Sequence, residues 1–202
     1  MIKYLDMVNV KGIIQVGANT GQEVPIFEKY CQNVILVEPL QEPLLHLYNL
    51  LHLKNLQYIV IESALGIEDE EKDFYLASNG ESSSLLKPNK HLVFYPTITF
   101  NDTMKVKVQR FDTLVEKLKI DMNDYNVVVT DTQGCDLDVL KGFGNLINNI
   151  DLIISEYINT ELYEGNQGLT LFKEYLKDFE LIETCDENNG AGNAIFKRIT
   201  NV

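Results

Sequence analysis

The stretch GIIQVGANTG, residues 12–21, joins a short apolar run to a loop that holds two glycines. The run predicts a buried strand over Gly12–Val16, and the segment that follows suits a helix over Gln22–Tyr30. Glycine lets the backbone turn tightly and approach a ligand, and a helix start offers free N–H groups. The loop Gly17–Gly21 is therefore a candidate ligand cradle. An ordinary strand-to-helix turn is the alternative, because the middle glycine of the dinucleotide fingerprint is replaced by Asn19.

The alternation of short apolar runs with helix-compatible segments continues outward along the chain. It predicts an α/β fold, a mostly parallel sheet with helices on both faces. The further strands are expected over Asn33–Val37, Leu56–Ile61, Asn126–Thr130, Asp151–Ser155, Phe179–Thr184 and Asn193–Lys197, and the further helices over Leu40–Leu53, Leu137–Leu146 and Leu169–Lys177. The polar segment Cys185–Gly192 predicts a hairpin, so that the seventh strand alone runs against the others.

The segment Glu70–Arg110 interrupts this rhythm, because its sequence predicts no helix. Its apolar and β-branched residues predict strands over Asp73–Ala77 and Lys105–Phe111, with a Gly-Glu-Ser-Ser-Ser turn between them. We interpret this segment as a β-rich insertion that folds over the edge or mouth of the sheet. No internal repeat or linker is evident, and we expect one domain over residues 1–202.

Composition limits the partners of the protein. Of its 202 residues, 30 are Asp or Glu and 17 are Lys or Arg, which gives a formal net charge of −13. This balance argues against a nucleic-acid partner, which needs clustered basic residues. No apolar run approaches the roughly 20 residues of a membrane span, and the first residues do not resemble a signal peptide. Three widely separated cysteines fit a reducing compartment. We therefore expect a cytoplasmic protein with a small-molecule partner and no membrane partner; its oligomeric state is not defined.

Glu38 and Pro39 follow the second predicted strand, at the edge of an open parallel sheet where ligands bind. This place, about 20 residues after a glycine loop, is where nucleotide-binding sheets hold ribose hydroxyls. An ionised carboxylate can accept hydrogen bonds from two neighbouring hydroxyls at once. A solvated acid at a strand end is the alternative, but the order and spacing of the two features favour a nucleotide-like ligand.

Two more carboxylates follow neighbouring strands at the same edge. Asp131 comes directly after the fourth predicted strand, and Glu156 comes directly after the fifth. Parallel strand ends meet at one edge, so the two acids are expected in one cleft, unless both are ordinary solvated strand ends. Such a pair can act in acid–base chemistry or hold Mg²⁺ or Mn²⁺.

Six segments, in this order, resemble the FkbM family of S-adenosylmethionine-dependent O-methyltransferases: Val16–Gly21, Val37–Pro39, Ala64–Gly66, Ser82–Leu85, Val108–Leu114 and Asp131–Gly142. The resemblance runs from Gly12 to Tyr157, and the specific signal is the ordered set. It implies the class I methyltransferase fold, a Rossmann-like sheet of seven strands with the last one antiparallel. It also implies that the β-rich insertion, which precedes the fourth main strand, lies near the acceptor site.

The resemblance further implies positions for the cofactor. The glycine loop would cradle its methionine portion, Glu38 would bind the ribose, Ser63 and Ala64 would flank the adenine, and the serine run of the insertion would close over it. The residues assigned to S-adenosylmethionine in this way are Gly17, Ala18, Asn19, Thr20, Gly21, Glu38, Pro39, Ser63, Ala64, Ser83, Ser84 and Asp131.

The expected function is transfer of a methyl group to a hydroxyl oxygen of a small acceptor, most simply a sugar or glycan. Asp131 is the candidate base or metal ligand, Glu156 would orient the acceptor or complete a metal site, and His91 of the insertion is a further catalytic candidate. Capping of the helix that follows is the alternative role for Asp131.

Two residues depart from the family pattern. Gln15 replaces an acidic residue before the glycine loop, and Gln133 replaces the glutamate of an Asp-x-Glu-Gly motif. The second departure leaves open a non-catalytic or altered cofactor-binding module of the same fold. A nicotinamide-dependent oxidoreductase is the remaining alternative, disfavoured by the absence of Gly-x-Gly-x-x-Gly and Tyr-x-x-x-Lys motifs.

Overall fold

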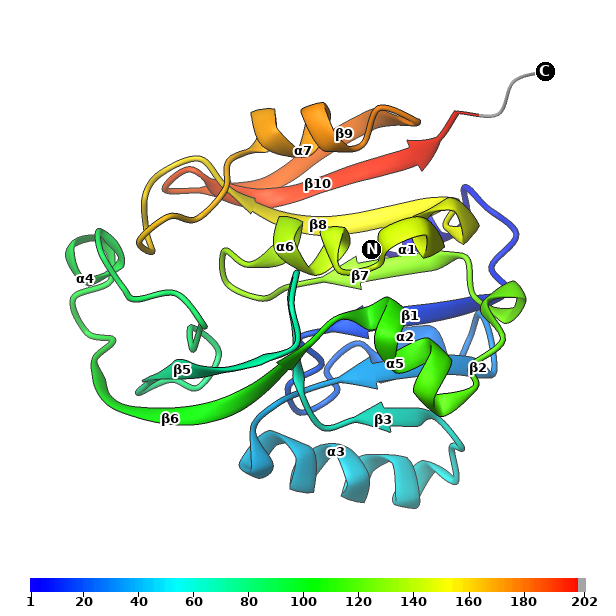
Figure 1. Ribbon diagram of the computed structural model, residues 1–202, viewed down its shortest axis with the longest axis horizontal. Coiled ribbons are helices and arrows are strands. Elements are labelled where there is room, and N and C mark those ends of the chain that lie inside the picture. The colour runs from blue at the N-terminus through cyan, green and yellow to red at the C-terminus, as the bar shows by residue number, and fades with distance from the viewer. Residues whose placement is uncertain (200–202) are drawn as a thin grey trace.

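The protein was analysed in a computed structural model, which describes residues 1–199 apart from the side chains at positions 186 and 187. Its main sheet has seven strands in the order β3-β2-β1-β7-β8-β10-β9 (Figure 1). Of the seven strands, β10 alone runs opposite to the others, since it pairs antiparallel with both β8 and β9. The strands are β1 (Gly12–Val16), β2 (Asn33–Val37), β3 (Ile59–Ile61), β7 (Val127–Thr130), β8 (Leu152–Ile158), β9 (Phe179–Asn188) and β10 (Ala191–Arg198). The predicted α/β class, with its seven-stranded and mostly parallel sheet, is confirmed.

Helices cover both faces of this sheet. Every residue of β1 is buried, and successive side chains of the strand enter different clusters, Ile13 with one and Ile14 with the other. One cluster includes residues of α1 (Ile2–Leu5), α2 (Val24–Phe27) and α3 (Gln41–Lys54), and the other includes residues of α5 (Phe111–Leu118), α6 (Asp136–Lys141) and α7 (Leu169–Tyr175). This alternation is what a strand buried on both faces requires.

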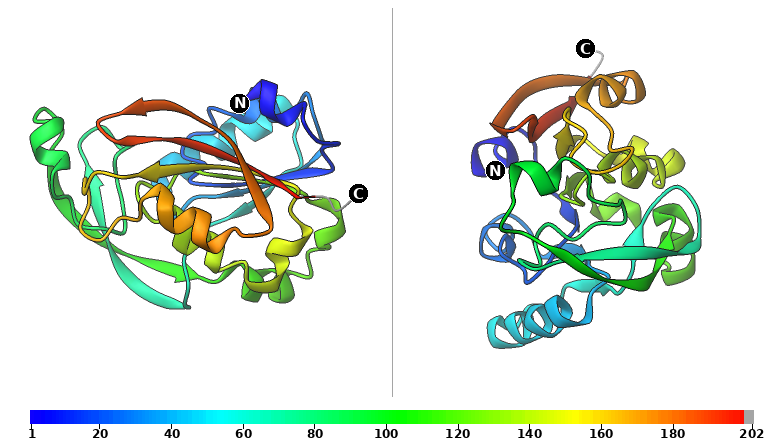
Figure 2. Two further views of the ribbon diagram at one scale, coloured as in Figure 1. Left: turned by 90° about the horizontal axis from the view of Figure 1, so that it is seen from above. Right: turned by 90° about the vertical axis from the view of Figure 1, so that its left-hand side faces the viewer.

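The insertion forms a second sheet of three strands in the order β4-β6-β5. Its strands are β4 (Ala64–Leu65), β5 (Glu70–Ala77) and β6 (Phe100–Gln109), and β5 pairs antiparallel with β6. Figures 1 and 2 show that β5 and β6 extend past the carboxyl ends of the main strands, with α4 (His91–Phe94) at the far end. The helix α4 corrects our expectation of no helix in this segment. One helical turn is too short for a hydrophobic period, and the N–H of His91 is held by the carbonyl of Leu162.

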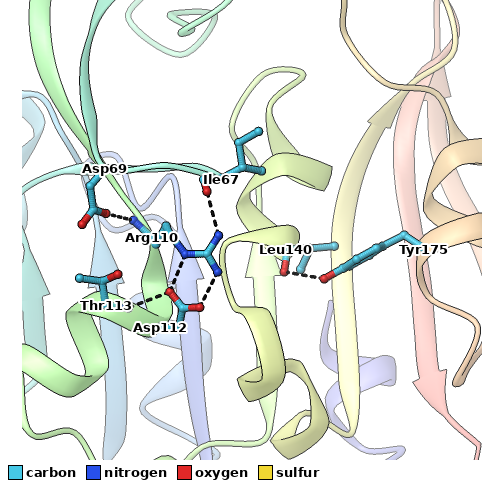
Figure 3. Close-up of polar contacts among 7 residues, drawn as sticks. All are labelled: Ile67, Asp69, Arg110, Asp112, Thr113, Leu140 and Tyr175. Atoms are coloured by element: carbon cyan, nitrogen blue, oxygen red, sulfur yellow. Dashed lines mark hydrogen bonds and ion pairs between the residues drawn. The ribbon is translucent and has the colours of Figure 1, made fainter.

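Arg110, at the junction of β6 and α5, ties the two ends of this insertion together (Figure 3). Its guanidinium donates to the carbonyl of Ile67 at 2.8 Å and to the Asp112 carboxylate, and its backbone N–H donates to Asp69 at 2.7 Å. The same guanidinium lowers the pKa of Asp112. The root of the β5–β6 hairpin is thereby fixed to the main domain beside α5.

Several boundaries differ from those expected. The helix expected over Gln22–Tyr30 is a regular helix only over α2, and the one expected over Leu137–Leu146 ends at Lys141 and is followed by the 3-10 helix η2 (Gly144–Asn149). Gly144 has a φ of +52°, which a regular helix does not accommodate. The helix α5 and the 3-10 helix η1 (Met122–Asp124) were not predicted.

The last hairpin is tighter than expected, because β9 continues to Asn188. The turn is Asn189–Gly190, with φ of +51° and +81°, as a two-residue turn between antiparallel strands requires. The strand β8 also continues beyond Ser155, so that Glu156 lies within the strand and not after it. Within residues 1–199, no helix is long and apolar enough to span a membrane.

Candidate active site

A cavity of about 690 Å³ opens at the carboxyl ends of β1, β2 and β7, beneath the insertion. The chain leaves β1 toward β2 on one side, whereas β7 lies on the other side, so the strand order reverses at this point. Ligands of open α/β sheets bind in the crevice that such a reversal creates. The fold therefore places a cavity where its chain topology favours a ligand.

The glycine loop forms one wall of this cavity and requires glycine at position 17. Gly17 has a φ of +82°, and a Cβ atom there would lie 1.9 Å from the carbonyl oxygen of Asp131. The N–H groups of Gly17 and Ala18 both donate to the carbonyl of Val37 at 3.0 Å. The loop after β1 is thus packed against the ends of both neighbouring strands, β2 and β7.

Glu38 is the buried carboxylate of the cavity, with 5% of its surface exposed. One oxygen accepts from the N–H of Asn19 at 3.0 Å, and the other accepts from the N–H of Leu40 at 2.9 Å. Burial raises the pKa of Glu38, while these two bonds favour its ionised form. A carboxylate oxygen has two lone pairs, so each oxygen can still accept from one further hydroxyl.

Gln15 and Ser63 carry polar atoms that are buried beside the cavity without a partner among the described residues. Gln15 is 3% exposed; its Nε2 donates to Oε2 of Glu23 at 2.8 Å, and its Oε1 accepts no bond. The hydroxyl of Ser63, 2% exposed, also has no partner. Such groups cost free energy unless a ligand or water satisfies them. Sequence reasoning missed Glu23, which supplies a carboxylate next to the amide at position 15.

The loop after β7 adds to the cavity a polar network centred on Gln133. Its Nε2 donates to Asp131 at 2.8 Å and makes a long contact of 3.5 Å with Oε2 of Glu156. The hydroxyl of Tyr163, which is fully buried, lies 3.0 Å from Oε1 of Gln133 and 2.9 Å from the carbonyl of Ser82. Gln133 adopts a φ of +54°, a strained conformation for a residue with a side chain. The network thus links the insertion, β7 and β8 through one amide.

The carboxyl groups near this network perturb one another. Desolvation by the surrounding protein raises the pKa of Asp131, although its side chain remains open to the cavity. The carboxylates of Glu23 and Glu81 raise this pKa further. Desolvation, with Asp131 and Asp136 nearby, raises the pKa of Glu156 well above its ordinary value. Desolvation also raises the pKa of Asp136 to about 7. The short bond from Gln133 favours the ionised form of Asp131, which we therefore regard as the carboxylate that stays charged.

Asp131 does not cap the helix that follows it. The helix α6 begins at Asp136, whose carboxylate accepts from the N–H groups of Thr132 at 3.0 Å and Gly134 at 3.3 Å. The alternative role that we considered for Asp131 is therefore wrong, because the N-cap residue of α6 is Cys135 and no side chain of the described residues caps the first turn of the helix. The carboxylate of Asp131 is left facing the cavity.

His91 lines the cavity from α4 but is 3% exposed and packs against Tyr95, Phe100 and Tyr163. Burial lowers its pKa, so the ring is neutral at pH 7, and its Nδ1 has no partner in the described chain. No group of three or more His, Cys, Asp or Glu side chains in residues 1–199 is arranged to hold a metal ion. Asp131 and Glu156 thus have no third ligand of these types.

Most of the residues expected at the cofactor or the acceptor line this one cavity: Gly17, Asn19, Glu38, Pro39, Ser63, Ala64, Ser83, His91, Asp131 and Glu156. Ala18, Gly21 and Ser84 are buried behind its wall, and Thr20 borders an adjoining pocket. Ser84 Oγ donates to the carbonyl of Gln133 at 2.8 Å. We therefore assign Ala18, Gly21 and Ser84 to support of the cavity wall.

Solved structures share this fold at low sequence identity. The methyltransferase FkbM from Methylobacillus flagellatus has a TM-score of 0.61 and 13% identity, over 93% of this chain and 44% of that one. An rRNA methylase from Streptococcus thermophilus has a TM-score of 0.54 and 8% identity, over 98% and 94% of the two chains. TrmK of M. capricolum, solved with S-adenosyl-homocysteine, has a TM-score of 0.50 and 11% identity, over 97% and 66%. At such identities the likeness concerns the fold alone.

Sequence comparison extends from the fold to the family. The chain is 28% identical over 131 residues to the 2-O-methyltransferase NoeI of Sinorhizobium fredii, a match over 61% of this chain. It spans about half, 53%, of the length of that relative. Residues 15–188, which include the glycine loop, Glu38, Asp131 and Glu156, match the family model described as the methyltransferase FkbM domain. The chain therefore belongs to the FkbM methyltransferase family.

Proposed function

We propose that the protein transfers a methyl group from S-adenosylmethionine to a hydroxyl oxygen of a small acceptor, a sugar or glycan. The observation that carries this proposal is that Glu38 and Asp131 open into one cavity on either side of the glycine loop. The carboxylate of Glu38 can accept hydrogen bonds from the ribose hydroxyls, and the carboxylate of Asp131 can accept the proton of an alcohol. The solved M. capricolum relative in complex with S-adenosyl-homocysteine and the 2-O-methyltransferase relative support the proposal.

The residues present fit the cofactor. Glu38 retains acceptor capacity on both oxygens for the two ribose hydroxyls. The orphaned Oε1 of Gln15, together with the carboxylate of Glu23, provides acceptors for an ammonium group at the end of β1. The buried hydroxyl of Ser63 stands beside Ala64 where a base would lie. The cofactor supplies a methyl group on a positively charged sulfur, which is a strong leaving group.

What the chain adds is alignment, exclusion of water and an acceptor for one proton. The acceptor oxygen forms a bond to the methyl carbon, the carbon–sulfur bond breaks with its electron pair left on sulfur, and Asp131 takes the hydroxyl proton. Gln133 holds the carboxylate of Asp131 through a 2.8 Å bond and cannot itself accept a proton at neutral pH. Glu156, on the next strand, faces the acceptor.

This assignment is tested with methyl-labelled S-adenosylmethionine and a panel of sugars, glycans and small alcohols, with mass spectrometry of the products. We expect an O-methylated product, and we expect Asp131→Asn to lose at least about 100-fold in turnover while retaining cofactor affinity and stability. A product from the wild type with normal turnover in Asp131→Asn would contradict the role of Asp131. Cofactor binding without transfer to any hydroxyl would instead favour the non-catalytic module that Gln133 suggests.

A further inference from the structure

The cavity wall carries an excess of carboxyl groups over basic groups. Its ionisable groups include five carboxyl groups, His91 and the N-terminal amine of Met1, and no lysine or arginine side chain lines it. His91 is neutral, because burial lowers its pKa. None of the five acids forms an ion pair within residues 1–199. These acids are Glu23, Glu38, Glu81, Asp131 and Glu156. An uncompensated set of this kind favours a cationic ligand and disfavours an anionic one.

The proposed cofactor accounts for only part of this charge. S-adenosylmethionine carries a sulfonium, an ammonium and a carboxylate, a net charge of one positive unit. Glu38 follows β2, where the ribose is placed above, and Glu23 is the N-cap residue of α2 and binds Gln15 of β1, where the ammonium group is placed. Of the other three acids, Glu81 is exposed and also borders the adjoining pocket beside the glycine loop, whereas Asp131 and Glu156 follow or lie in β7 and β8. Asp131 alone suffices to take a hydroxyl proton. Two carboxyl groups are thus left without a task.

Of these two acids, Glu81 and Glu156, it is Glu156 that lies in a strand of the main sheet. It lies in β8 opposite Asn193 of β10, and its side chain is partly buried. The Nε2 of Gln133 approaches one of its carboxylate oxygens at 3.5 Å, which is too long for a strong hydrogen bond. Desolvation raises the pKa of Glu156, so its ionised form is costly in the free protein, and a cation supplied by a ligand would offset that cost and hold Glu156 ionised. The strand therefore holds a carboxylate ready for a charged partner.

A second observation points to a ligand in the same cavity. His91 lines this cavity and is 3% exposed, and its buried Nδ1 has no partner in the described chain. Orphaned polar atoms of this kind are rare unless a ligand or water completes them. The cavity thus combines an unpaired acid on β8 with an unpaired imidazole nitrogen on α4.

We propose that the acceptor is an amino sugar or related amino alcohol, and that Glu156 binds its protonated amine while Asp131 faces the hydroxyl that is methylated. This inference rests on the proposed function and specifies its acceptor class. The amine is not altered in the reaction; it orients the acceptor by an ion pair with Glu156. Acceptors that carry phosphate or carboxylate groups are excluded by repulsion from the same acids.

The test uses the full chain saturated with S-adenosyl-homocysteine, in buffer with a chelator so that no divalent ion competes. Glucosamine, glucose and glucose 6-phosphate are titrated separately, and binding is followed by ligand-observed NMR. We expect glucosamine to bind at least about tenfold more tightly than glucose, and glucose 6-phosphate not to bind. Glu156→Gln should abolish the advantage of glucosamine and leave the affinity for S-adenosyl-homocysteine unchanged. Glu161→Gln, which removes an exposed acid outside the cavity, should preserve that advantage.

The inference is overturned if glucosamine shows no advantage over glucose, whether both bind equally or neither binds, or if the advantage persists in Glu156→Gln. These outcomes leave the proposed function intact as long as S-adenosyl-homocysteine binds. If S-adenosyl-homocysteine itself does not bind, both this inference and the proposed function are overturned. A calorimetric titration of the protein with S-adenosyl-homocysteine alone distinguishes this case from the others.

Discussion

Replacing Glu38 with alanine tests the cofactor site at its most buried charge. The substitution removes a carboxylate that is 5% exposed and that accepts backbone N–H bonds from Asn19 and Leu40. Loss of one charged hydrogen-bond partner costs about 1.5–3 kcal/mol in total, so removing Glu38 should weaken binding of S-adenosyl-homocysteine by about one to two orders of magnitude. Isothermal titration calorimetry of wild type and variant measures this difference.

Two companion variants separate binding from folding. Glu38→Gln keeps one acceptor oxygen, so its affinity should lie between those of wild type and Glu38→Ala. Glu62→Ala removes an exposed acid that binds the hydroxyl of Tyr48 and does not line the cavity, so its affinity should equal that of wild type. Glu38→Ala also leaves two backbone N–H groups without an acceptor, and we expect its free energy of unfolding to fall by about 1–3 kcal/mol. A folded Glu38→Ala variant with wild-type affinity refutes the assignment of Glu38.

Two further predictions concern the frame of the site. Desolvation raises the pKa of Asp136 to about 7, so between about pH 4 and pH 7 the folded state holds a proton that the unfolded chain has lost. The free energy of unfolding should therefore fall as pH rises through this window, by up to about 1.4 kcal/mol per pH unit. Asp136→Asn should reduce this slope, which is measured by urea unfolding of both proteins at several pH values. Equal slopes in wild type and variant would show that Asp136 is not the cause. Gly17→Ala places a Cβ atom 1.9 Å from the carbonyl of Asp131 at a φ of +82°, which should cost at least about 1–3 kcal/mol and weaken cofactor binding; unchanged stability and affinity would contradict this packing of the loop.

The main sheet was predictable because its strands are short apolar runs that are buried on both faces, such as Val34–Val37. The order of motifs along the chain then indicated the crevice, and Glu38 and Asp131 do open into one cavity. Helix ends were less predictable. The segment after Lys141 becomes a 3-10 helix around Gly144, and α4 is a single turn held by a contact with Leu162. Such features depend on residues distant in sequence.

The polar network centred on Gln133 was the least predictable part of the site. Tyr163 reaches Gln133 across 30 positions of sequence, and no local pattern marks it as a site residue. Glu23 meets Gln15 only because the helix α2 folds back beside β1. Asp136 holds the loop before α6 through the N–H groups of Thr132 and Gly134, a role that no local pattern indicates. These relations arise from tertiary packing, which a single sequence does not reveal.

A crystal structure of the protein in complex with S-adenosyl-homocysteine tests the central claim most directly. We predict that both ribose hydroxyls lie about 2.5–3.0 Å from the carboxylate oxygens of Glu38, the usual distance for such hydrogen bonds. We also predict that the sulfur faces Asp131 across the cavity lined by the glycine loop. A bound ligand with its ribose away from Glu38, or with its sulfur turned from Asp131, would contradict the proposed site.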